Sequence, residues 1–168
     1  MIMGNTGKTF ITYLSLVLFI AGILSAKSLN ERYAANFTLK DTSGEEYSLS
    51  DFKGKIVILN FWATWCAPCL REMPDLEQIN KKYKDQGVQV IGIVVVSKLE
   101  DVASTLRKTG VTYPILYGSK KTIAAYDNFY SIPQTFIIGR DGKILKRLSG
   151  SNSYSTFEKE IKAVLMNE

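Results

Sequence analysis

The sequence contains no histidine, and this absence excludes several kinds of catalysis. Without an imidazole there is no Ser–His or Cys–His pair, no histidine-ligated metal and no histidine proton shuttle. Cysteine is also scarce: with only 2 cysteines, Cys66 and Cys69, a four-cysteine zinc site within one chain is excluded. The formal net charge is +5, but the basic residues are scattered, and their densest run, 81–84, is typical of a solvated helix face. We expect no nucleic-acid partner, because no basic stripe with interleaved base-reading residues occurs.

A long apolar run near the N-terminus indicates a targeting segment. Residues 10–24 are uncharged and strongly apolar, Lys8 precedes them, and small residues around Ala26 follow. This order is typical of a secretory signal. As a helix, the uncharged run 9–26 would span about 27 Å, close to the roughly 30 Å hydrocarbon core of a membrane. The sequence therefore predicts that residues 1–28 are a cleaved signal peptide or a retained membrane anchor. Residues 29–168 are then one domain in the periplasm or cell envelope.

Beyond residue 28, the predicted strands first alternate with helices. A hairpin and a final helix then follow. The apolar runs at 56–62 and 88–96 predict buried central strands. Helical spacing between them, with Pro68 near the start and Gly87 as the stop, predicts a helix from about Cys69 to Tyr83. The other expected elements are an N-terminal hairpin over 37–49, helices at 101–108 and 122–126, a strand at 115–117, a hairpin over 135–148, and a last helix that begins at a capping box of Ser155 and Glu158. This order implies a mixed sheet covered on both faces.

The segment Trp65-Cys66-Ala67-Pro68-Cys69 lies at a strand-to-helix junction and carries the chemistry. A thiolate is the nucleophile in disulfide exchange, and a helix N-terminus favours negative charge. We therefore expect Cys66, the more exposed sulfur, to attack a partner's disulfide and form a mixed disulfide. Cys69 lies one helical turn further on the same face, so it can resolve the intermediate and leave the Cys66–Cys69 pair oxidised.

Two alternatives for the cysteine pair need no redox activity. One is a stabilising disulfide, but closing so short a loop contributes about 2 kcal/mol, against ~4–5 kcal/mol for a loop of about 100 residues. The other is half of a zinc site shared between chains. The strand–helix context favours the redox interpretation over both.

Three further features are candidate parts of the same site. Glu72, three residues after Cys69, could accept the proton of Cys69, or it could be a solvated helix glutamate. Pro133 precedes the strand at 135–138. A cis bond there would expose the Ile132 backbone to an extended substrate, whereas local sequence alone favours an ordinary trans proline at a strand start. Trp62 and Trp65 could pack around the strand end, or Trp65 could shield the disulfide and touch substrate.

The motif W-C-A-P-C, with N-F-W-A-T before it and L-R-E-M-P after it, resembles the TlpA/ResA-like branch of the thioredoxin superfamily. The later segment S-I-P-Q-T-F-I-I-G-R-D-G-K-I is similar to that family's cis-proline segment and following hairpin. The resemblance covers about residues 33–165. It implies a thioredoxin-like three-layer α/β/α fold with a mixed central sheet, an N-terminal β-hairpin extension and a central insertion at 99–126. It also implies that Cys66 is the nucleophile, Cys69 the resolving cysteine, Pro133 the cis proline and Glu72 the active-site glutamate.

The resemblance also carries expectations about function. General thioredoxins have a buried aspartate six residues before the first cysteine, where this sequence has Asn60. This departure fits the branch, shifts the acid–base role toward Glu72 and argues against cytosolic, general-purpose thioredoxin activity. Members of the branch typically reduce envelope proteins, in many cases apocytochrome c. They draw electrons from a membrane thiol-relay protein of the CcdA or DsbD kind and need no cofactor.

The leading hypothesis is therefore an exported dithiol reductase of envelope proteins, and three alternatives remain. A disulfide-forming oxidase is disfavoured because no histidine lies between the cysteines. A peroxiredoxin-type peroxidase would have Thr or Ser three residues before its reactive cysteine, where this chain has Ala63. A Cu(I)-binding module could use the two thiolates, but no further soft ligand completes a site.

Overall fold

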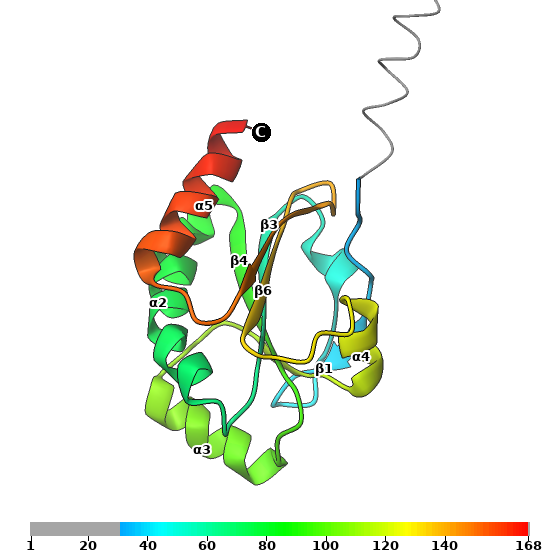
Figure 1. Cartoon of the computed structure of the whole chain (residues 1–168), viewed down its shortest axis with the longest axis vertical. Helices are drawn as coiled ribbons and strands as arrows, with labels where there is room; N and C mark the ends of the chain where they lie inside the picture. The colour runs from blue at the N-terminus through cyan, green and yellow to red at the C-terminus, as the bar shows by residue number, and fades with distance from the viewer. Residues whose placement is uncertain (1–30, 168) are drawn as a thin grey trace, which may run out of the picture. The chain divides into compact units, whose positions relative to one another are not determined.

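A five-stranded mixed sheet forms the centre of the domain (Figure 1). The computed structural model describes residues 31–167, and in it the strand order is β5-β4-β3-β6-β7. The central strand β3 (Ile56–Trp62) is parallel to β4 (Val88–Val94) and antiparallel to β6 (Gln134–Ile138). The edge strands are β5 (Ile115–Tyr117) and β7 (Ile144–Ser149). Every residue of β3 is buried, as its unbroken apolar sequence predicts.

Three helices pack on one face of the sheet. They are α2 (Ala67–Tyr83), α3 (Leu99–Thr109) and α5 (Tyr154–Asn167), and Figure 1 shows them together on one side. The apolar residues between these helices and the sheet form one core, which includes Trp62, Met73 and Phe157. Gly87 follows the short 3-10 helix η2 (Lys84–Gln86) in the left-handed conformation that glycine adopts most readily, so the predicted stop is confirmed.

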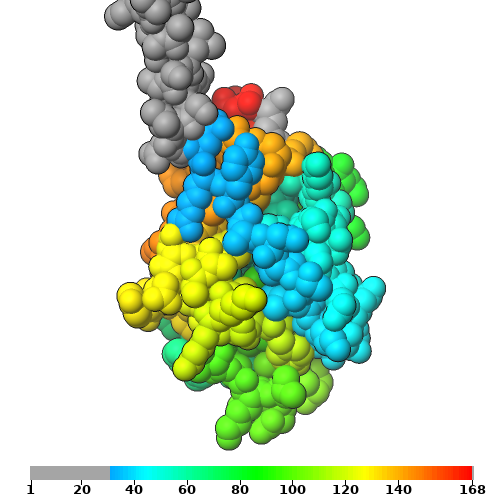
Figure 2. Space-filling model, turned by 90° about the vertical axis from the view of Figure 1, so that its right-hand side faces the viewer, coloured from blue at the N-terminus to red at the C-terminus, as the bar shows by residue number. Residues whose placement is uncertain are grey.

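The opposite face is covered by the N-terminal segment and by α4 (Lys120–Ala125). The N-terminal hairpin pairs β1 (Thr38–Lys40) with β2 (Glu46–Ser48), and the 3-10 helix η1 (Leu49–Phe52) follows it. Figure 2 shows α4, in yellow, beside this N-terminal segment, in blue and cyan. Beneath them, the rings of Phe61, Tyr126 and Phe136 contact one another, with centroids 5.2–5.9 Å apart. The expected three-layer α/β/α architecture with an N-terminal hairpin is therefore confirmed.

Strand direction brings three separate segments to one edge of the sheet. Because β3 and β4 are parallel and Trp62 pairs with Val94, the loops that follow these strands lie side by side. Because β6 is antiparallel to β3 and Gln134 pairs with Phe61, the segment that precedes β6 reaches the same edge. The cysteine motif, the segment after β4 and the Ile132–Pro133 segment are thereby assembled in one place.

Several predicted boundaries differ from those observed. The strand predicted at 88–96 ends at Val94, because Val96 has a backbone φ of 48° that no strand accommodates. The last helix begins at Tyr154, so the predicted capping box of Ser155 and Glu158 is wrong. The Glu158 carboxylate instead accepts hydrogen bonds from Lys82 and from two tyrosine hydroxyls.

The segment expected as a central insertion, 99–126, forms α3, β5 and α4. The predicted signal peptide or anchor at 1–28 lies outside the described residues. In the part of the chain from 31 to 167, no helix is both long enough and apolar enough to cross a membrane.

Candidate active site

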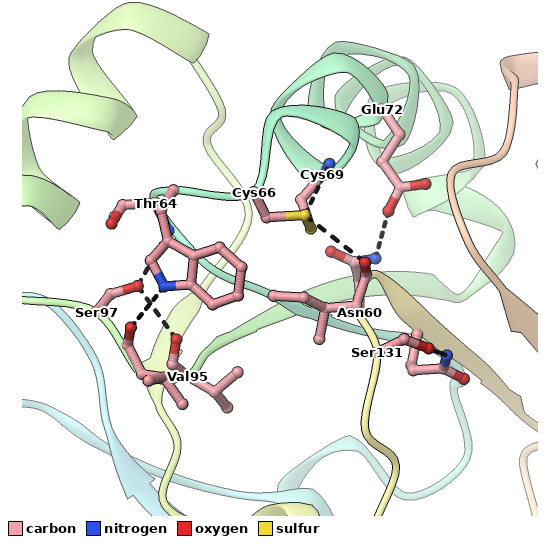
Figure 3. The surroundings of a disulfide bond; sticks show 12 residues. Asn60, Thr64, Cys66, Cys69, Glu72, Val95, Ser97 and Ser131 are labelled. Carbon is pink, nitrogen blue, oxygen red and sulfur yellow. Dashed lines mark hydrogen bonds between the residues drawn. A yellow bond between two sulfur atoms is a disulfide. The ribbon is translucent and has the colours of Figure 1, made fainter.

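Cys66 and Cys69 form a disulfide at the N-terminus of α2 (Figure 3). Cys66 is the N-cap residue of the helix, and its Sγ accepts a hydrogen bond from the Cys69 N–H at 3.3 Å. Cys66 is 5% exposed and Cys69 is fully buried, so Cys66 is the more accessible sulfur, as expected. A negative charge on Cys66 would therefore meet an N–H donor and the positive end of the helix dipole.

The local sequence accounts for this geometry. Pro68 lies in the first turn of α2, where its missing N–H leaves no hydrogen bond unmade. The Cys66 N–H donates to the Ala63 carbonyl and closes a turn after β3. The Leu70 N–H donates to the Cys66 carbonyl and begins the helix. The chain thus turns directly from a buried strand into a helix, with one sulfur at the junction and the other a turn further on.

The Ile132–Pro133 segment lies against the first sulfur. The peptide bond between these two residues is cis, and the Ile132 carbonyl oxygen lies 3.8 Å from Cys66 Sγ. Gln134, the next residue, is buried, and its Nε2 donates to Ser131 Oγ at 3.4 Å. This short segment is thereby held at its start and at its end, beside the sulfur expected to act as nucleophile.

Strand β7 anchors Gln134 from the other side. The Gln134 Oε1 atom accepts hydrogen bonds from Arg147 Nε and from Ser149 Oγ, both at 2.9 Å. Arg147 also forms an ion pair with Asp127, which lies in the loop leading to the Ile132–Pro133 segment. Sequence reasoning did not identify Gln134. Its position directly after the proline, at the start of a buried strand, was the available signal.

Glu72 is buried beside the disulfide and is only 1% exposed, so its interpretation as a solvated helix glutamate is wrong. Its carboxylate accepts hydrogen bonds from Asn60 Nδ2 at 2.8 Å and from the Asn152 N–H at 2.9 Å. Burial raises the pKa of Glu72 to about 7, and the charge of Asp75 adds to this rise, while the two hydrogen bonds oppose it. Glu72 can therefore take or release a proton near neutral pH.

Asn60 connects Glu72 to the sheet. It lies on β3, is fully buried, and its Nδ2 donates to Glu72 Oε1 and also to Thr135 Oγ1 at 3.0 Å. Its Oδ1 has no hydrogen-bond partner among residues 31–167. In Figure 3 the Asn60 side chain lies between the disulfide and the Glu72 carboxylate.

Trp65 is 65% exposed, so the expectation that it packs around the strand end is wrong, whereas Trp62 is fully buried. The Trp65 indole N–H donates to the Val96 carbonyl at 2.8 Å. Val96 has a positive φ, a conformation that costs about 1–3 kcal/mol for a residue other than glycine. The Thr64 N–H donates to Ser97 Oγ at 3.0 Å and fastens the same two loops. The exposed Trp65 indole is thus fixed to the loop that follows β4.

Two further residues of the site were missed by the sequence interpretation. Ser97 could have been found, because the ends of two parallel strands meet at one sheet edge. Asn152 contacts Glu72 through its backbone N–H, which no side-chain pattern reveals. Among residues 31–167, no group of three or more Cys, Asp or Glu side chains is arranged to hold a metal ion.

Comparisons with known proteins match most of the described chain. The sequence profile of the AhpC/TSA family matches residues 31–147. Thiol-disulfide oxidoreductase ResA of Bacillus subtilis (strain 168) is 38% identical over 123 residues, which cover 73% of this chain and 68% of the relative. ResA of Geobacillus kaustophilus (strain HTA426) is 34% identical over 131 residues, which cover 78% of this chain and 75% of the relative.

Solved structures show the same fold. The thiol:disulfide interchange protein, a thioredoxin family protein of Chlorobium tepidum TLS, superposes with a TM-score of 0.76 at 29% identity, covering 82% of this chain and 99% of that one. StoA of Bacillus subtilis superposes with a TM-score of 0.64 at 26% identity, covering 75% of this chain and 96% of that one. The expected thioredoxin-like fold is therefore confirmed.

Proposed function

We propose a direction and a cellular role for this chain, which belongs to the AhpC/TSA family and is a TlpA/ResA-like thiol–disulfide oxidoreductase. It works outside the cytoplasm and reduces disulfides of envelope proteins, with apocytochrome c among its substrates. A membrane thiol-relay protein returns electrons to it. The apolar run at 10–24 supports the location, since it is suited to export or anchoring.

The exchange proceeds in two steps. In the reduced protein the Cys66 thiolate attacks one sulfur of the substrate disulfide, forming a mixed disulfide and releasing the other substrate sulfur as a thiolate that takes up a proton. Cys69 then gives its proton to Glu72, and its thiolate attacks the Cys66 sulfur. The second substrate sulfur leaves as a thiolate and takes up a proton, so the substrate gains two electrons and the protein is left with the Cys66–Cys69 disulfide.

The observation that carries this proposal is the buried carboxylate of Glu72 on the helical face of Cys69. A carboxylate near the thiols opposes a negative charge on sulfur, so it destabilises the reduced, ionised form relative to the disulfide. Strong oxidants are the opposite case, because their reduced form is stabilised. The residues between the cysteines, Ala67 and Pro68, carry no charge that could stabilise a thiolate. These charges favour the disulfide form over the ionised dithiol form, so they favour a protein that reduces its substrate.

Substrate binding is assigned to the surface around Cys66. We expect an extended segment of the substrate to lie along Ile132 and Pro133, with its disulfide at Cys66 and its apolar side chains against Trp65. The Ile132 carbonyl oxygen supports this arrangement, because it lies 3.8 Å from the accessible sulfur, and so does the exposed indole of Trp65, the residue directly before Cys66. Aromatic residues fixed in one orientation are effective anchors in such contacts.

The reduction potential of the Cys66–Cys69 pair tests the direction. A value below about −230 mV supports a reductase, whereas a value near −120 mV would establish an oxidase instead. The purified domain should also reduce insulin and an oxidised C-x-x-C-H peptide of apocytochrome c. Activity that persists in Cys66→Ser would contradict the mechanism.

Simple assays test the two alternatives of a peroxidase and a Cu(I)-binding module. Ala63 is fully buried and brings no hydroxyl to the site, so we expect no robust peroxide turnover by the domain. Stoichiometric copper retained by the reduced domain after chelation would favour a Cu(I)-binding module. Loss of that copper would dismiss it.

A further inference from the structure

The buried amide of Asn60 has an unused hydrogen-bonding atom beside the reacting groups. Its Nδ2 serves two acceptors, Glu72 Oε1 and Thr135 Oγ1, whereas its Oδ1 serves no donor within residues 31–167. A buried carbonyl oxygen without a donor is unfavourable, so its persistence in a fully buried side chain needs an explanation. Two working orientations of the Asn60 side chain would account for it.

Exchanging the amide oxygen and nitrogen produces a second complete set of contacts. The Oδ1 atom would then lie where Nδ2 lies now, next to Glu72 Oε1 and Thr135 Oγ1. A protonated Glu72 could donate to it, and the Thr135 hydroxyl could too, because a hydroxyl both donates and accepts. The Nδ2 atom would occupy the position that has no partner now, on the side where Figure 3 shows the two sulfurs. The ionised carboxylate therefore suits the present orientation, and the protonated one suits its reverse.

We propose that the Asn60 amide reverses when Glu72 receives the Cys69 proton, and that the reversed amide donates an N–H to the Cys69 thiolate. This inference rests on the role proposed above for Glu72 as the proton acceptor. One proton moves from Cys69 Sγ to the Glu72 carboxylate, and the O–H so formed donates to Asn60 Oδ1. The thiolate left behind accepts from Nδ2 until it attacks the Cys66 sulfur of the mixed disulfide.

The surroundings of Glu72 leave this role to an uncharged side chain. The charged group facing it from its own helix is Asp75, which opposes a second negative charge. The phenol of Tyr113, ahead of β5, is buried and also lies within the electrostatic reach of Glu72. Asn152 contributes a backbone N–H, and β3 contributes Asn60. None of these groups is a cation, and the Asn60 amide is the neutral side-chain donor among them that can serve the charge on Cys69.

Nuclear magnetic resonance of the disulfide form tests the reversal directly, because Glu72 then titrates without competing thiols. At about pH 9 we expect the Asn60 side-chain NH₂ protons to show nuclear Overhauser contacts to Thr135. At about pH 5 these contacts should be replaced by contacts to the Cys69 β-protons. In Glu72→Gln the contacts to Cys69 should persist at both pH values, because the introduced amide can donate to Oδ1. Contacts that stay the same at both pH values in the wild type would overturn the proposal.

Kinetics provide a second test with a matched control. In Asn60→Leu, resolution of a mixed disulfide by Cys69 should slow about tenfold at neutral pH, the loss expected for one hydrogen bond to a charged sulfur. Its pH profile should also move to higher pH, while formation of the mixed disulfide by Cys66 keeps its rate. Asn80→Leu removes another buried asparagine of the same core, whose Oδ1 accepts from the Val90 N–H. It should lower stability without moving the pH profile.

The roles of Glu72 and of Asn60 can be refuted separately. If Glu72→Gln leaves the titration of Cys69 unchanged, the role of Glu72 in the proposed function is wrong. If that titration moves but Asn60→Leu has the pH profile of the wild type, only the role of Asn60 is wrong.

Discussion

The substitution Glu72→Gln should make the protein more stable at alkaline pH while slowing its reaction. The pKa of Glu72 is raised to about 7 in the folded protein, whereas it is near 4.5 in an unfolded chain. The folded state therefore keeps a proton that the unfolded state loses between about pH 4.5 and pH 7. Stability falls over that interval as the pH rises, because ionising a buried carboxyl is unfavourable.

The size of this destabilisation follows from the change in the pKa of Glu72 on folding. A difference of about 2.5 pKa units, at 1.36 kcal/mol per unit, destabilises the folded protein by about 3 kcal/mol above pH 7. A glutamine of the same shape has no charge to bury and can keep both contacts if the Asn60 amide reverses. We therefore expect Glu72→Gln to be about 2–3 kcal/mol more stable than the wild type at about pH 8, and nearly equal to it at about pH 4.

Urea unfolding of the disulfide form, followed by tryptophan fluorescence at the two pH values, measures this difference. Glu77→Gln is the matched control, since Glu77 lies on the same helix and is also buried. Burial acts to raise the pKa of Glu77, but hydrogen bonds from Thr112 together with the Lys81 ammonium lower it overall. Its ionised form thus stabilises the fold at neutral pH, and that contribution is lost as the pH falls, so Glu77→Gln should be less stable at about pH 8.

The same substitution should lower the rate of the reaction, although it raises stability. An unassisted thiol with a pKa of about 8.5 is only ~3% ionised at pH 7, so losing the proton acceptor should slow resolution by Cys69 about 30-fold or more. Stopped-flow release of a chromophoric thiol from the mixed disulfide measures this rate. A Glu72→Gln protein whose stability difference from the wild type does not change with pH would refute the assignment of a raised pKa to Glu72.

Substitutions at three other positions have defined outcomes. Cys69→Ser should accumulate a mixed disulfide through Cys66 that persists on a mass spectrum, and rapid turnover without accumulation would contradict the order of attack. Gly92→Ala should lower the free energy of unfolding by about 1–3 kcal/mol in urea titrations, because the new Cβ would lie 2.5 Å from Ile115 Cδ1 and 3.1 Å from the rigid indole of Trp62, so buried side chains would have to shift. Trp65→Ala should raise the KM for a peptide disulfide about tenfold or more with little loss of stability, whereas Trp65→Phe should keep most of the affinity; equal KM values for all three proteins would remove Trp65 from the substrate surface.

The fold could be predicted closely from the sequence where one-dimensional patterns dominate. The buried runs of β3 and β4, the helix that follows Pro68, and the edge strand at 115–117 all occur at or near the predicted residues. These elements are fixed by apolar periodicity and by proline and glycine at their ends, which are local properties. The start of α5 was misplaced, because the carboxylate of Glu158 contacts Lys82 and Tyr83, which lie far away in the sequence.

In the candidate site, too, local sequence predicts some features, whereas others depend on contacts with distant residues. The placement of Cys66 and Cys69 at a helix start followed from the apolar run before them, from Pro68 and from the helical spacing after Cys69. The burial of Glu72 did not, because it depends on the Asn152 backbone, some 80 residues away, closing over the carboxylate. Helical spacing placed Glu72 on the face of Cys69, but no periodicity could distinguish a solvated glutamate from one sealed beneath the loop before α5. The exposure of Trp65 depends likewise on the unusual backbone of Val96 in a neighbouring loop.

The N-terminal hairpin has a consequence for how partner chains can approach. Asp41, at its turn, forms an antiparallel bridge to Leu116 and covers part of the β5 edge. At the opposite margin, β7 carries the exposed cations Lys146 and Arg147, which discourage pairing with a further strand. Both margins of the sheet are thus protected against edge-to-edge aggregation. A polypeptide that is still unfolded can therefore contact the domain without adding a strand to this sheet.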